Sequence, residues 1–345
     1  MISVGILGGT GFGAGELLRI LANHPVAKVV AATSRSSAGS GYDSVHPHLT
    51  SIYDAAFVAS LEDAGFGDQA NQCVFSALPH GESGKAVEEV LAKFPETKVI
   101  DLSGDLRLRD LDQHREHYGH SPDLEAIRQE AAYGLTEVNS EAVVGARVVA
   151  NPGCLATASA LALLPFENRD LKSVHQHLAT GSSGSGKDPK ASTHHPVRHA
   201  NFLAYKALEH QHVPEVVQVL QDHHVKVDNL PFVAHSLPIS RGILATTFVE
   251  LNAPSTQENI EYLFAEYYVG KPFIRLRGAK PAEIENVVGS NFCDISIKVK
   301  GNQVVIHTAI DNLVKGMAGQ AIHNMNLMFG LPETTGLWFG GWRPV

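Results

Sequence analysis

The chain opens with a glycine-rich turn between a strand-like and a helix-like segment. Residues 2–7 form a continuous apolar run, typical of a buried parallel strand. Gly8-Gly9-Thr10-Gly11-Phe12-Gly13-Ala14-Gly15 follow, and residues 16–23 then predict a helix that ends before Pro25. Glycines let the backbone turn sharply and approach a pyrophosphate, and a helix N-terminus supplies N–H groups and a positive dipole. This order predicts a dinucleotide-binding turn, although a merely flexible turn would have the same composition.

The strand–helix alternation continues through the first part of the chain. Apolar runs at 28–33, 73–78 and 98–102 predict buried strands, and the amphipathic segment 82–94 predicts a helix. Strands that alternate with helices favour an α/β fold with a doubly wound parallel sheet, the Rossmann type.

The pattern changes near residue 150. After a predicted helix at 155–164, alternating runs dominate and predict a mixed or antiparallel sheet with a hairpin at Lys300-Gly301-Asn302. The clearest of these runs are 242–251, 291–298 and 303–310. We therefore expect a dinucleotide-binding domain at 1–150 and a second α/β domain at 151–315. A C-terminal helix and tail at 316–345 would pack back on the first domain.

Composition excludes several classes of protein. The 345 residues suffice for about two domains, and 44% hydrophobic with 18% charged residues is typical of a globular chain. The net charge of −9 argues against nucleic-acid binding, which needs a basic surface. No apolar run approaches the ~20 residues of a membrane span. Met1-Ile2-Ser3-Val4 lacks the basic residues of a secretory signal.

The second predicted strand ends in Thr33-Ser34-Arg35-Ser36-Ser37. An NAD-specific site needs an Asp or Glu there to bind the ribose 2′-OH, whereas an Arg accommodates a 2′-phosphate. No carboxylate is present, so the sequence predicts NADPH with Ser34, Arg35 and Ser36 around the phosphate. The alternative is that Arg35 is a solvated loop cation.

Cys154 follows Asn151-Pro152-Gly153 at the start of a predicted helix. A helix N-terminus favours the thiolate, which predicts a nucleophile rather than a buried structural cysteine. Cys73 and Cys293 lie in apolar segments and have the structural interpretation. Three widely spaced cysteines without a CxxC pair predict a reducing, cytoplasmic location instead of a disulfide framework.

A catalytic thiolate needs a proton-transfer partner, and 19 histidines offer several. His210-Gln211-His212-Val213-Pro214-Glu215 combine two imidazoles with a carboxylate, and His194-His195 and His223-His224 are competing pairs. A metal site built on the His210-x-His212 pair is an alternative. We expect no metal, because the chain lacks the cysteine pairs or the H-E-x-x-H helix typical of zinc sites.

Two further loops carry cations. Gly181-Ser182-Ser183-Gly184-Ser185-Gly186-Lys187 can present N–H groups to an anion, or serve as a flexible linker. Arg107 follows the strand expected at 98–102, where ligands gather in open α/β sheets. It can bind a substrate carboxylate or pair with Asp101 or Asp105.

In this order, these motifs resemble the N-acetyl-γ-glutamyl-phosphate reductase family of arginine biosynthesis. They also resemble its close relative in lysine biosynthesis, which acts on an aminoadipyl phosphate tethered to a carrier protein. The resemblance runs nearly end to end. The matching segments are Gly8–Leu17, Thr33–Arg35, Leu78–Gly81, Asp101–Arg107, Asn151–Cys154, His210–Glu215 and Asp311–Gly316.

The resemblance implies a Rossmann domain joined to an α/β catalytic domain, NADPH as the cofactor, and a homo-oligomer, dimer or tetramer. It implies that Cys154 attacks an acyl phosphate to form a thioester, which NADPH reduces to the aldehyde while His210 shuttles the proton. The substrate-binding residues that it implies are Arg107, Ser182, Ser183, Lys187, His212 and Glu215. The cofactor-binding residues that it adds are Leu78, Pro79, His80, Pro152, Gly184, Asn312 and Lys315.

The sequence departs from the family pattern in places. Gly13-Ala14 replaces the usual Ala-Gly, and Lys187 replaces an Arg, so phosphate would meet a point charge rather than a planar fork. His194-His195-Pro196-x-Arg198 is closer to the lysine branch, whereas Asn201-Phe202-x-Ala204-Tyr205 is closer to the arginine branch. The group on the substrate amine stays open between acetyl, another acyl group and an acidic carrier protein. The cations that would attract such a carrier are Lys187, Lys190, Arg198 and Lys206.

Three functions remain in competition. We expect a cytoplasmic NADPH-dependent reductase of N-acetyl-γ-glutamyl phosphate. The same chemistry on a carrier-linked or differently acylated substrate is the first alternative. A non-catalytic dinucleotide sensor is the second, and the presence of both Cys154 and His210 argues against it.

Overall fold

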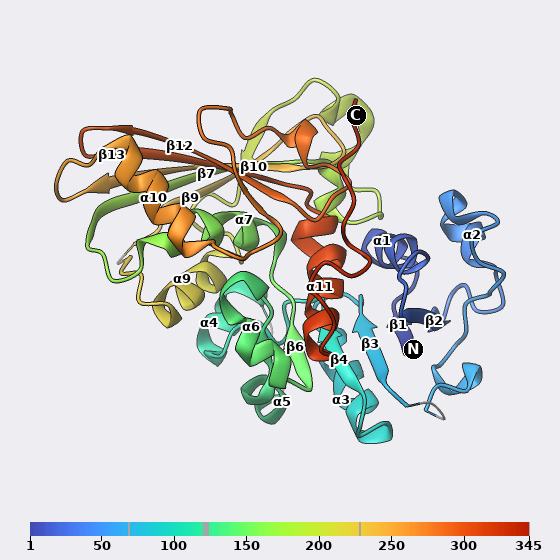
Figure 1. Ribbon diagram of the computed structural model, residues 1–345. Coiled ribbons are helices and arrows are strands. Elements are labelled where there is room, and N and C mark those ends of the chain that lie inside the picture. The colour runs from blue at the N-terminus through green and yellow to red at the C-terminus, as the bar shows by residue number, and fades with distance from the viewer. Residues whose placement is uncertain (68–69, 120–123, 228, 345) are drawn as a thin grey trace. The chain divides into compact units, whose positions relative to one another are not determined.

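Two β-sheets organise the structure, a computed structural model that describes residues 1–67, 70–119, 124–227 and 229–344 (Figure 1). The chain divides into two compact units. Unit 1 comprises Met1–Pro152 and Met317–Trp338, and unit 2 comprises Gly153–Gly316 and the residues from Phe339 onward. Each unit combines helices with a sheet, so the predicted α/β class is confirmed.

Unit 1 is built on a parallel sheet that has six strands within the described ranges, in the order β2-β1-β3-β4-β6-β5. Every residue of β1 is buried, which explains why its sequence is apolar apart from Ser3 and does not alternate. The strands expected in this part of the chain are present, with ends that shift by one or two residues. The strands are β1 (Ile2–Leu7), β2 (Ala27–Ala32), β3 (Gln72–Ser76), β4 (Lys98–Asp101), β5 (Ala132–Tyr133) and β6 (Val148–Ala150).

N-cap residues mark where two helices of unit 1 begin. α1 begins at Phe12, earlier than the helix expected from residue 16, because Gly11 takes an extended N-cap conformation directly after the turn. α4 begins after Asp110, whose carboxylate accepts the N–H groups of Asp112 and Gln113. The helices before α11 are α1 (Phe12–Leu21), α2 (Tyr42–Val45), α3 (Ser83–Lys93), α4 (Leu111–Tyr118), α5 (Glu125–Glu130) and α6 (Thr136–Gly145).

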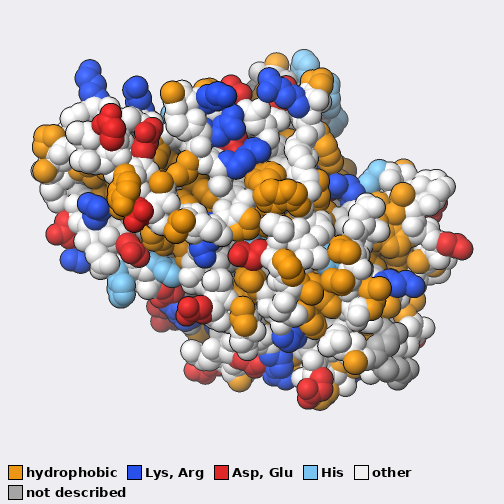
Figure 2. Space-filling model, viewed as in Figure 1, with side chains coloured by type: hydrophobic (Ala, Val, Ile, Leu, Met, Phe, Trp, Pro, Cys, Tyr) orange, Lys and Arg blue, Asp and Glu red, His pale blue; other side chains and the backbone are white. Residues whose placement is uncertain are grey.

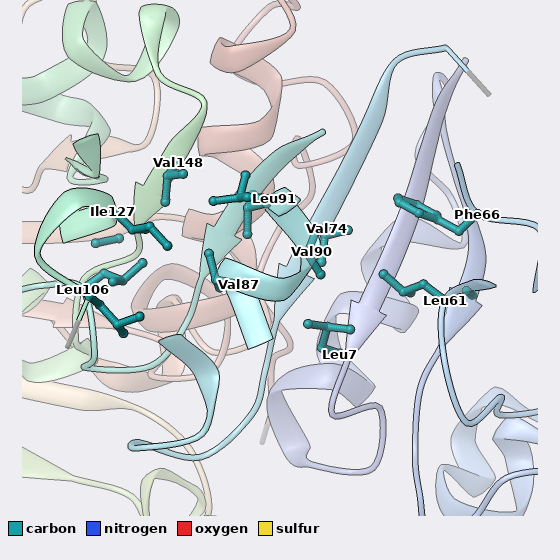
Figure 3. Close-up of a cluster of buried hydrophobic side chains, with 14 residues drawn as sticks. Leu7, Leu61, Phe66, Val74, Val87, Val90, Leu91, Leu106, Ile127 and Val148 are labelled. Carbon is teal, nitrogen blue, oxygen red and sulfur yellow. The ribbon is translucent and has the colours of Figure 1, made fainter. Parts of the chain in front are cut away.

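An apolar core joins the sheet of unit 1 to α3 (Figure 3). Val87, Val90 and Leu91 share one face of this helix at the i, i+3, i+4 spacing of an amphipathic helix. They lie in one cluster with Leu7 and Val74 of the sheet. The parallel pairing of β1 with β3 places the carboxyl ends of both strands at a common edge.

Helix α11 (Gly319–Met328) packs against α1, α6 and β4 of unit 1. The amides of Gln320 and Asn324 both donate to the carbonyl of Gly134, at 2.8 and 2.9 Å. A Cβ at Gly134 would lie 2.4 Å from Asn324 Nδ2, so this close approach requires glycine. The residues directly before the helix form a π-helical turn, Val314–Ala318, which the helical pattern did not distinguish.

Unit 2 is built on a mixed sheet that has seven strands within the described ranges, in the order β11-β12-β13-β10-β7-β9-β8. The β11–β12 and β7–β9 pairs are parallel and the other pairs are antiparallel. Gly301, with a φ of +62°, turns the predicted hairpin between β12 and β13. The strands are β7 (Leu171–Thr180), β8 (Leu203–Tyr205), β9 (Phe232–Ser236), β10 (Ile243–Leu251), β11 (Ile274–Leu276), β12 (Cys293–Lys300) and β13 (Gln303–Ile310).

Helix α7 is the central helix of unit 2. Its residues after the first are all buried, and it contacts α9, β10 and β13. Thr308 on β13 donates its hydroxyl proton to the carbonyl of Ala158 at 2.7 Å, which satisfies a buried polar pair between sheet and helix. The helices of the unit are α7 (Cys154–Leu163), α8 (His195–Arg198), α9 (Val213–Asp222) and α10 (Gln257–Tyr267).

The C-terminal tail differs from the expected arrangement, because the residues after Trp338 belong to unit 2. The N–H of Trp342 donates to the carbonyl of Val288 at 2.8 Å, and the guanidinium of Arg241 lies 5.0 Å from the indole centre. The expectation that 316–345 packs as a whole on the first domain does not hold for these last residues.

Figure 2 shows Lys and Arg side chains gathered in the upper part of the view.

Among the residues that the structure describes, no helix combines the length and apolar character that a membrane span requires.

Phe75 tests the core of unit 1, because its ring is fully buried on β3. We expect Phe75→Ala to lower the free energy of unfolding by about 3–5 kcal/mol, through lost burial and the cavity left behind. Glu88→Ala, on the exposed face of α3, should change it by less than about 0.5 kcal/mol. Urea denaturation followed by circular dichroism measures the free energy of unfolding of both variants. Equal midpoints for the two variants would contradict the assignment of Phe75 to the core.

Candidate functional site

The glycine turn of unit 1 leaves its backbone open. Gly8 has a φ of +75°, and a Cβ there would lie 2.9 Å from the carbonyl oxygen of Ala77, so glycine is required. A Cβ at Gly11 would meet no atom within 4 Å. Gly11 is also the N-cap of α1, where the first N–H groups of a helix can bind an anion. Gly13 instead packs closely, because a Cβ there would lie 2.5 Å from Met317 Sδ.

The other residues expected around the cofactor lie at the same edge of the sheet. The N–H of Gly9 donates to the carbonyl of Thr33 at 2.8 Å, which joins the turn to the loop at 34–36. The Leu78 side chain lies 3.1 Å from the Cβ direction of Gly8. Arg35 is exposed and forms no ion pair with any residue of the described chain. Its guanidinium is therefore accessible to an external phosphate.

The loops after β3 and β4 are tied together. His80 is exposed, and its Nδ1 accepts the N–H of Gly104 at 2.6 Å. The carboxylate of Asp105 accepts the N–H groups of Gly81 and Gly84. These bonds hold the segment that the resemblance assigns to the cofactor. The remaining predicted cofactor residues of unit 1 are Thr10, half-buried, Phe12 and Pro79, exposed, and Pro152, buried at the end of the unit.

Arg107 is buried in unit 1. Its Nε donates to the carbonyl of Asn151 and its Nη2 to that of Leu102, both at 2.8 Å. Bonds to carbonyls were not among the partners that the sequence suggested. They give Arg107 a structural role at the ends of β4 and β6, since a buried guanidinium needs acceptors for its N–H groups.

Cys154 is the first residue of α7, as predicted. The first N–H to bond inside the helix is that of Thr157, which donates to the carbonyl of Gly153 at 2.9 Å. The N–H groups of residues 154–156 therefore lie in the first turn of the helix, before the internal hydrogen bonds begin. Cys154 is half-buried, whereas Cys73 and Cys293 are buried. Burial raises the pKa of the Cys73 thiol, so it stays protonated and unreactive.

His212 and Glu215 meet at the residue before the nucleophile. The N–H of Gly153 donates to Glu215 Oε2 at 3.0 Å. The Nε2 of His212 lies 3.8 Å from Glu215 Oε1 and only 2.4 Å from the Cβ direction of Gly153. All three residues belong to unit 2. The second imidazole of the predicted motif therefore lies against the turn that presents Cys154.

His210 is buried beside this group. Its Nδ1 accepts the N–H of His212 at 3.1 Å, which places the proton of the neutral ring on Nε2. Burial lowers the pKa of His210 to about 2, helped by His212 and Lys206 and opposed by Glu215. At neutral pH this imidazole is uncharged and presents an Nε2–H donor. It packs against Phe232, with 5.4 Å between the ring centres.

Tyr205 at the end of β8 is a member of this cluster that motif analysis left without a role. Its ring centre lies 5.8 Å from that of His210. Burial raises the pKa of Tyr205, and the proximity of Cys154 raises it further while Arg198 lowers it. The phenol therefore stays protonated near the thiol. The spacing of Tyr205 from the nucleophile in sequence offered no signal for this proximity.

The competing histidine pairs lie elsewhere. His223 and His224 follow the C-terminal end of α9, which is about 15 Å long and has His212 at its other end. His194 and His195 are exposed. Within the described ranges, no group of three or more His, Cys, Asp or Glu side chains is placed to hold a metal ion.

The Gly/Ser loop takes a different form from the expected anion cradle. Its first residues form a short 3-10 helix, Ser182–Ser185. The N–H groups of Ser182 and Ser183 donate to the carbonyls of Ile239 and Ser240, at 2.9 and 3.0 Å. These two N–H groups therefore do not serve an anion. Lys187 is exposed beyond the short helix.

Asn312 connects this loop to the end of β13. Its Nδ2 donates to Ser183 Oγ at 2.9 Å and its Oδ1 accepts the N–H of Gly242 at 2.7 Å. Gly184 is exposed beside it, with its Cβ direction 3.8 Å from Asn312 Nδ2. Asn312 and Gly184, expected at the cofactor, are thus brought together with Ser183, expected at the substrate.

The turn after Asn312 depends on Asp311, whose role motif analysis did not specify. The buried Asp311 carboxylate accepts the N–H groups of Leu313 and Val314, at 2.7 and 2.9 Å. Lys315 is fully buried, and its Nζ lies 6.0 Å from the ring centre of Phe273. A Cβ at Gly316 would lie 2.5 Å from Cys154 Cβ. The turn therefore brings Gly316 directly against the nucleophile.

Comparison with known proteins agrees with these two halves. Residues 3–146 match the family model described as the semialdehyde dehydrogenase NAD binding domain. Residues 154–312 match the model described as the semialdehyde dehydrogenase dimerisation domain. The chain is 40% identical over 344 residues to the N-acetyl-γ-glutamyl-phosphate reductase of Brevibacillus brevis, with 98% of each chain covered. The chain belongs to the N-acetyl-γ-glutamyl-phosphate reductase family. The resemblance noted in the sequence is confirmed.

Other similar proteins support the family and the fold. The N-acetyl-γ-glutamyl-phosphate reductase of Archaeoglobus fulgidus is 42% identical, over 97% of this chain and 98% of that one. The solved structure of aspartate semialdehyde dehydrogenase II from Vibrio cholerae has a TM-score of 0.70 and 16% identity, covering 96% and 98% of the two chains. At that identity the likeness shows a shared fold and nothing more.

Gly316 tests the packing around the thiol. We expect Gly316→Ala to lower the free energy of unfolding by about 1–3 kcal/mol, because its methyl group would overlap Cys154 Cβ. The same overlap should slow alkylation of Cys154 by iodoacetamide. Urea denaturation and mass spectrometry of the labelled thiol measure the two effects. Gly340→Ala, where a Cβ meets no atom within 4 Å, is the control, and equal behaviour of both variants would refute the packing.

Proposed function

We propose that the protein reduces N-acetyl-γ-glutamyl phosphate to N-acetylglutamate 5-semialdehyde with NADPH and releases phosphate, a step of arginine biosynthesis. The observation that carries the proposal is the half-buried Cys154 thiol at the first position of α7, in a chain about 40% identical to reductases of that name. Catalysis through a thiol suits the reaction, because a thioester is an electrophile that accepts hydride where a carboxylate does not.

Cys154 would act twice. Its thiolate attacks the acyl carbon, the bond from that carbon to the phosphate oxygen breaks, and inorganic phosphate leaves. After reduction the carbon–sulfur bond breaks, the aldehyde forms, and the thiolate is restored. The oxyanion of each tetrahedral state needs donors, and the N–H groups of residues 155 and 156 in the first turn of α7 would supply them.

A neutral imidazole with an Nε2–H is suited to donate a hydrogen bond to a substrate oxygen in this cluster. His210 has that form. Tyr205, which also stays protonated, is a second donor near the thiol. We propose that the Nε2–H of His210 hydrogen-bonds the oxyanion of the tetrahedral states, with Tyr205 as a support for it, and that the proton consumed by the reaction leaves on the inorganic phosphate.

NADPH supplies the hydride when it is bound. The residues that would hold it fit a dinucleotide, since the backbone at Gly11 is open and Gly8 takes a conformation that other residues avoid. Unit 1 would be the cofactor-binding domain and unit 2 the catalytic domain. We propose that Ser34, Arg35 and Ser36 bind the 2′-phosphate.

The assay that tests the reaction runs it in reverse. Purified protein is mixed with N-acetylglutamate semialdehyde, phosphate and NADP⁺, and the absorbance of reduced nicotinamide is followed. Phosphate-dependent reduction of NADP⁺ is the expected result. A protein that binds NADP⁺ and carries a reactive thiol, yet shows no reduction, would contradict the acetylated substrate.

A carrier-linked acyl phosphate is the second candidate substrate. The exposed cations Lys187, Lys190 and Lys206 favour an acidic partner. Arg198 is excluded from that surface role, because its guanidinium donates to Ser236 Oγ and to the carbonyl of Leu237. Retention of the protein on an immobilised acidic carrier, together with no activity on the acetylated substrate, would favour this candidate.

Assembly and location complete the proposal. We propose a homo-oligomer, dimer or tetramer, supported by the match of residues 154–312 to a dimerisation domain. We propose the cytoplasm as its location, where the three free thiols would remain reduced.

Cys154→Ser tests the nucleophile. We expect turnover to fall below detection, because a serine hydroxyl is a far weaker nucleophile than a thiolate at neutral pH. NADPH binding, measured by fluorescence, should remain. Cys293→Ala, which removes a buried thiol, is the control and should keep turnover. Full activity of the serine variant would refute the assignment.

Arg35→Ala tests the choice of cofactor. Loss of a charge-assisted bond to the 2′-phosphate costs about 1.5–3 kcal/mol, so we expect the KM for NADPH to rise by roughly ten- to a hundredfold. The KM for NADH should not change. Lys28→Ala removes an exposed cation from β2, the strand that precedes Arg35, and serves as the control. An equal effect on both cofactors would exclude the phosphate contact.

A further inference from the structure

Two side chains of unit 2, those of Glu215 and His212, converge on Gly153, the residue that precedes Cys154. The N–H of Gly153 donates to Glu215 Oε2 at 3.0 Å. The other carboxylate oxygen, Oε1, lies 3.8 Å from His212 Nε2. The imidazole of His212 in turn occupies the space where a Cβ of Gly153 would be, at 2.4 Å from Nε2. One carboxylate therefore contacts both the backbone and the ring that define this turn.

Glu215 is placed for this task by its own helix. It lies in the first turn of α9, directly after Pro214, where the helix dipole favours a negative charge. Its side chain has no exposed surface. A buried carboxylate needs donors within the protein, and the bond from Gly153 is one that it cannot lose without cost. The position of α9 is thus coupled to the start of α7.

The Gly153 peptide is also held on its other side. Its carbonyl accepts both the N–H and the hydroxyl proton of Thr157, at 2.9 and 3.2 Å. With its N–H bound to Glu215 and its carbonyl bound inside α7, the residue has little freedom to rotate. Its backbone is extended, with φ −70° and ψ 145°. The direction in which Cys154 leaves this residue, and hence the direction of its thiol, depends on both sets of bonds.

We propose that Glu215 is a positioning residue that orients the Gly153–Cys154 turn and holds His212 against it, instead of a residue that binds the substrate. This inference rests on the proposed function, because it assigns a role within the same thiol site. It differs from the substrate contact that the family resemblance implied. A positioning role acts on the free enzyme, whereas a substrate contact acts only when substrate is present.

Two substitutions at Glu215 separate these roles. Glu215→Gln keeps an oxygen that can accept the N–H of Gly153, and Glu215→Ala removes it. The matched control is Glu209→Gln, which removes one negative charge from an exposed position shortly before His210. The first measurement is the rate at which iodoacetamide alkylates Cys154 without substrate, read by mass spectrometry of the peptide. Circular dichroism and thermal melting establish that each variant is folded.

We expect Glu215→Ala to slow alkylation by about tenfold or more, the factor that corresponds to loss of a hydrogen bond to a charged group. Glu215→Gln should stay within about threefold of the natural protein, because a neutral acceptor keeps part of that bond. In turnover, kcat should fall in parallel with the alkylation rate while KM changes little. Glu209→Gln should match the natural protein in both measurements.

Other results would overturn the proposal. If Glu215→Ala is folded and alkylated at the natural rate while KM rises, Glu215 binds the substrate. If Glu215→Gln is as slow as Glu215→Ala, charge rather than the Gly153 bond controls the thiol, and the orienting role is refuted. Because alkylation needs no substrate, it still tests Glu215 if the natural protein fails to reduce NADP⁺ in the reverse assay. That failure, in a protein that binds NADP⁺ and carries a reactive thiol, would refute the proposed acetylated substrate and not the role of Glu215.

Discussion

The hydrogen bond from the Gly153 N–H to the buried carboxylate of Glu215 joins the starts of α7 and α9, directly before Cys154. A buried carboxylate is costly unless donors surround it, so the two helix ends cannot separate freely. Cys154 opens one helix, and His212 precedes the other. Together with the packing of α7 on α9, this bond holds Cys154 and the imidazole motif, far apart in sequence, close to each other.

Glycines make that approach possible. Side-chain atoms at Gly153 or Gly316 would overlap His212 or Cys154, so the thiol lies between two residues that must lack a Cβ. In unit 1 the same principle acts at Gly8, where a Cβ would lie 2.9 Å from the carbonyl oxygen of Ala77, whereas a Cβ at Gly11 would meet no atom within 4 Å. In both units glycine serves a close approach to a reacting or binding group, rather than flexibility.

Much of the fold could be predicted because its signals are local. The apolar strand β1, the turn after it, and the hairpin at Gly301 follow from periodicity and turn chemistry. Contacts across long sequence distances could not. Arg107 donates to two backbone carbonyls, and Ser182 and Ser183 use their N–H groups on residues 239 and 240, which no spacing rule indicates. Tyr205 near Cys154 is a further contact of this kind.

The sequence by itself determined the class of fold, the place of the phosphate turn, the cysteine that opens a helix, and the family. Each of these features depends on a short segment of the sequence, and the local backbone preferences of that segment are enough to specify the feature. Only the tertiary structure decided which of the histidines lie beside the turn before Cys154, that His210 is uncharged there, and that the Glu215 carboxylate accepts the N–H of Gly153. Charge state and hydrogen-bond partners depend on burial and on neighbours from distant segments, which exist only once the sheet and the helices have packed.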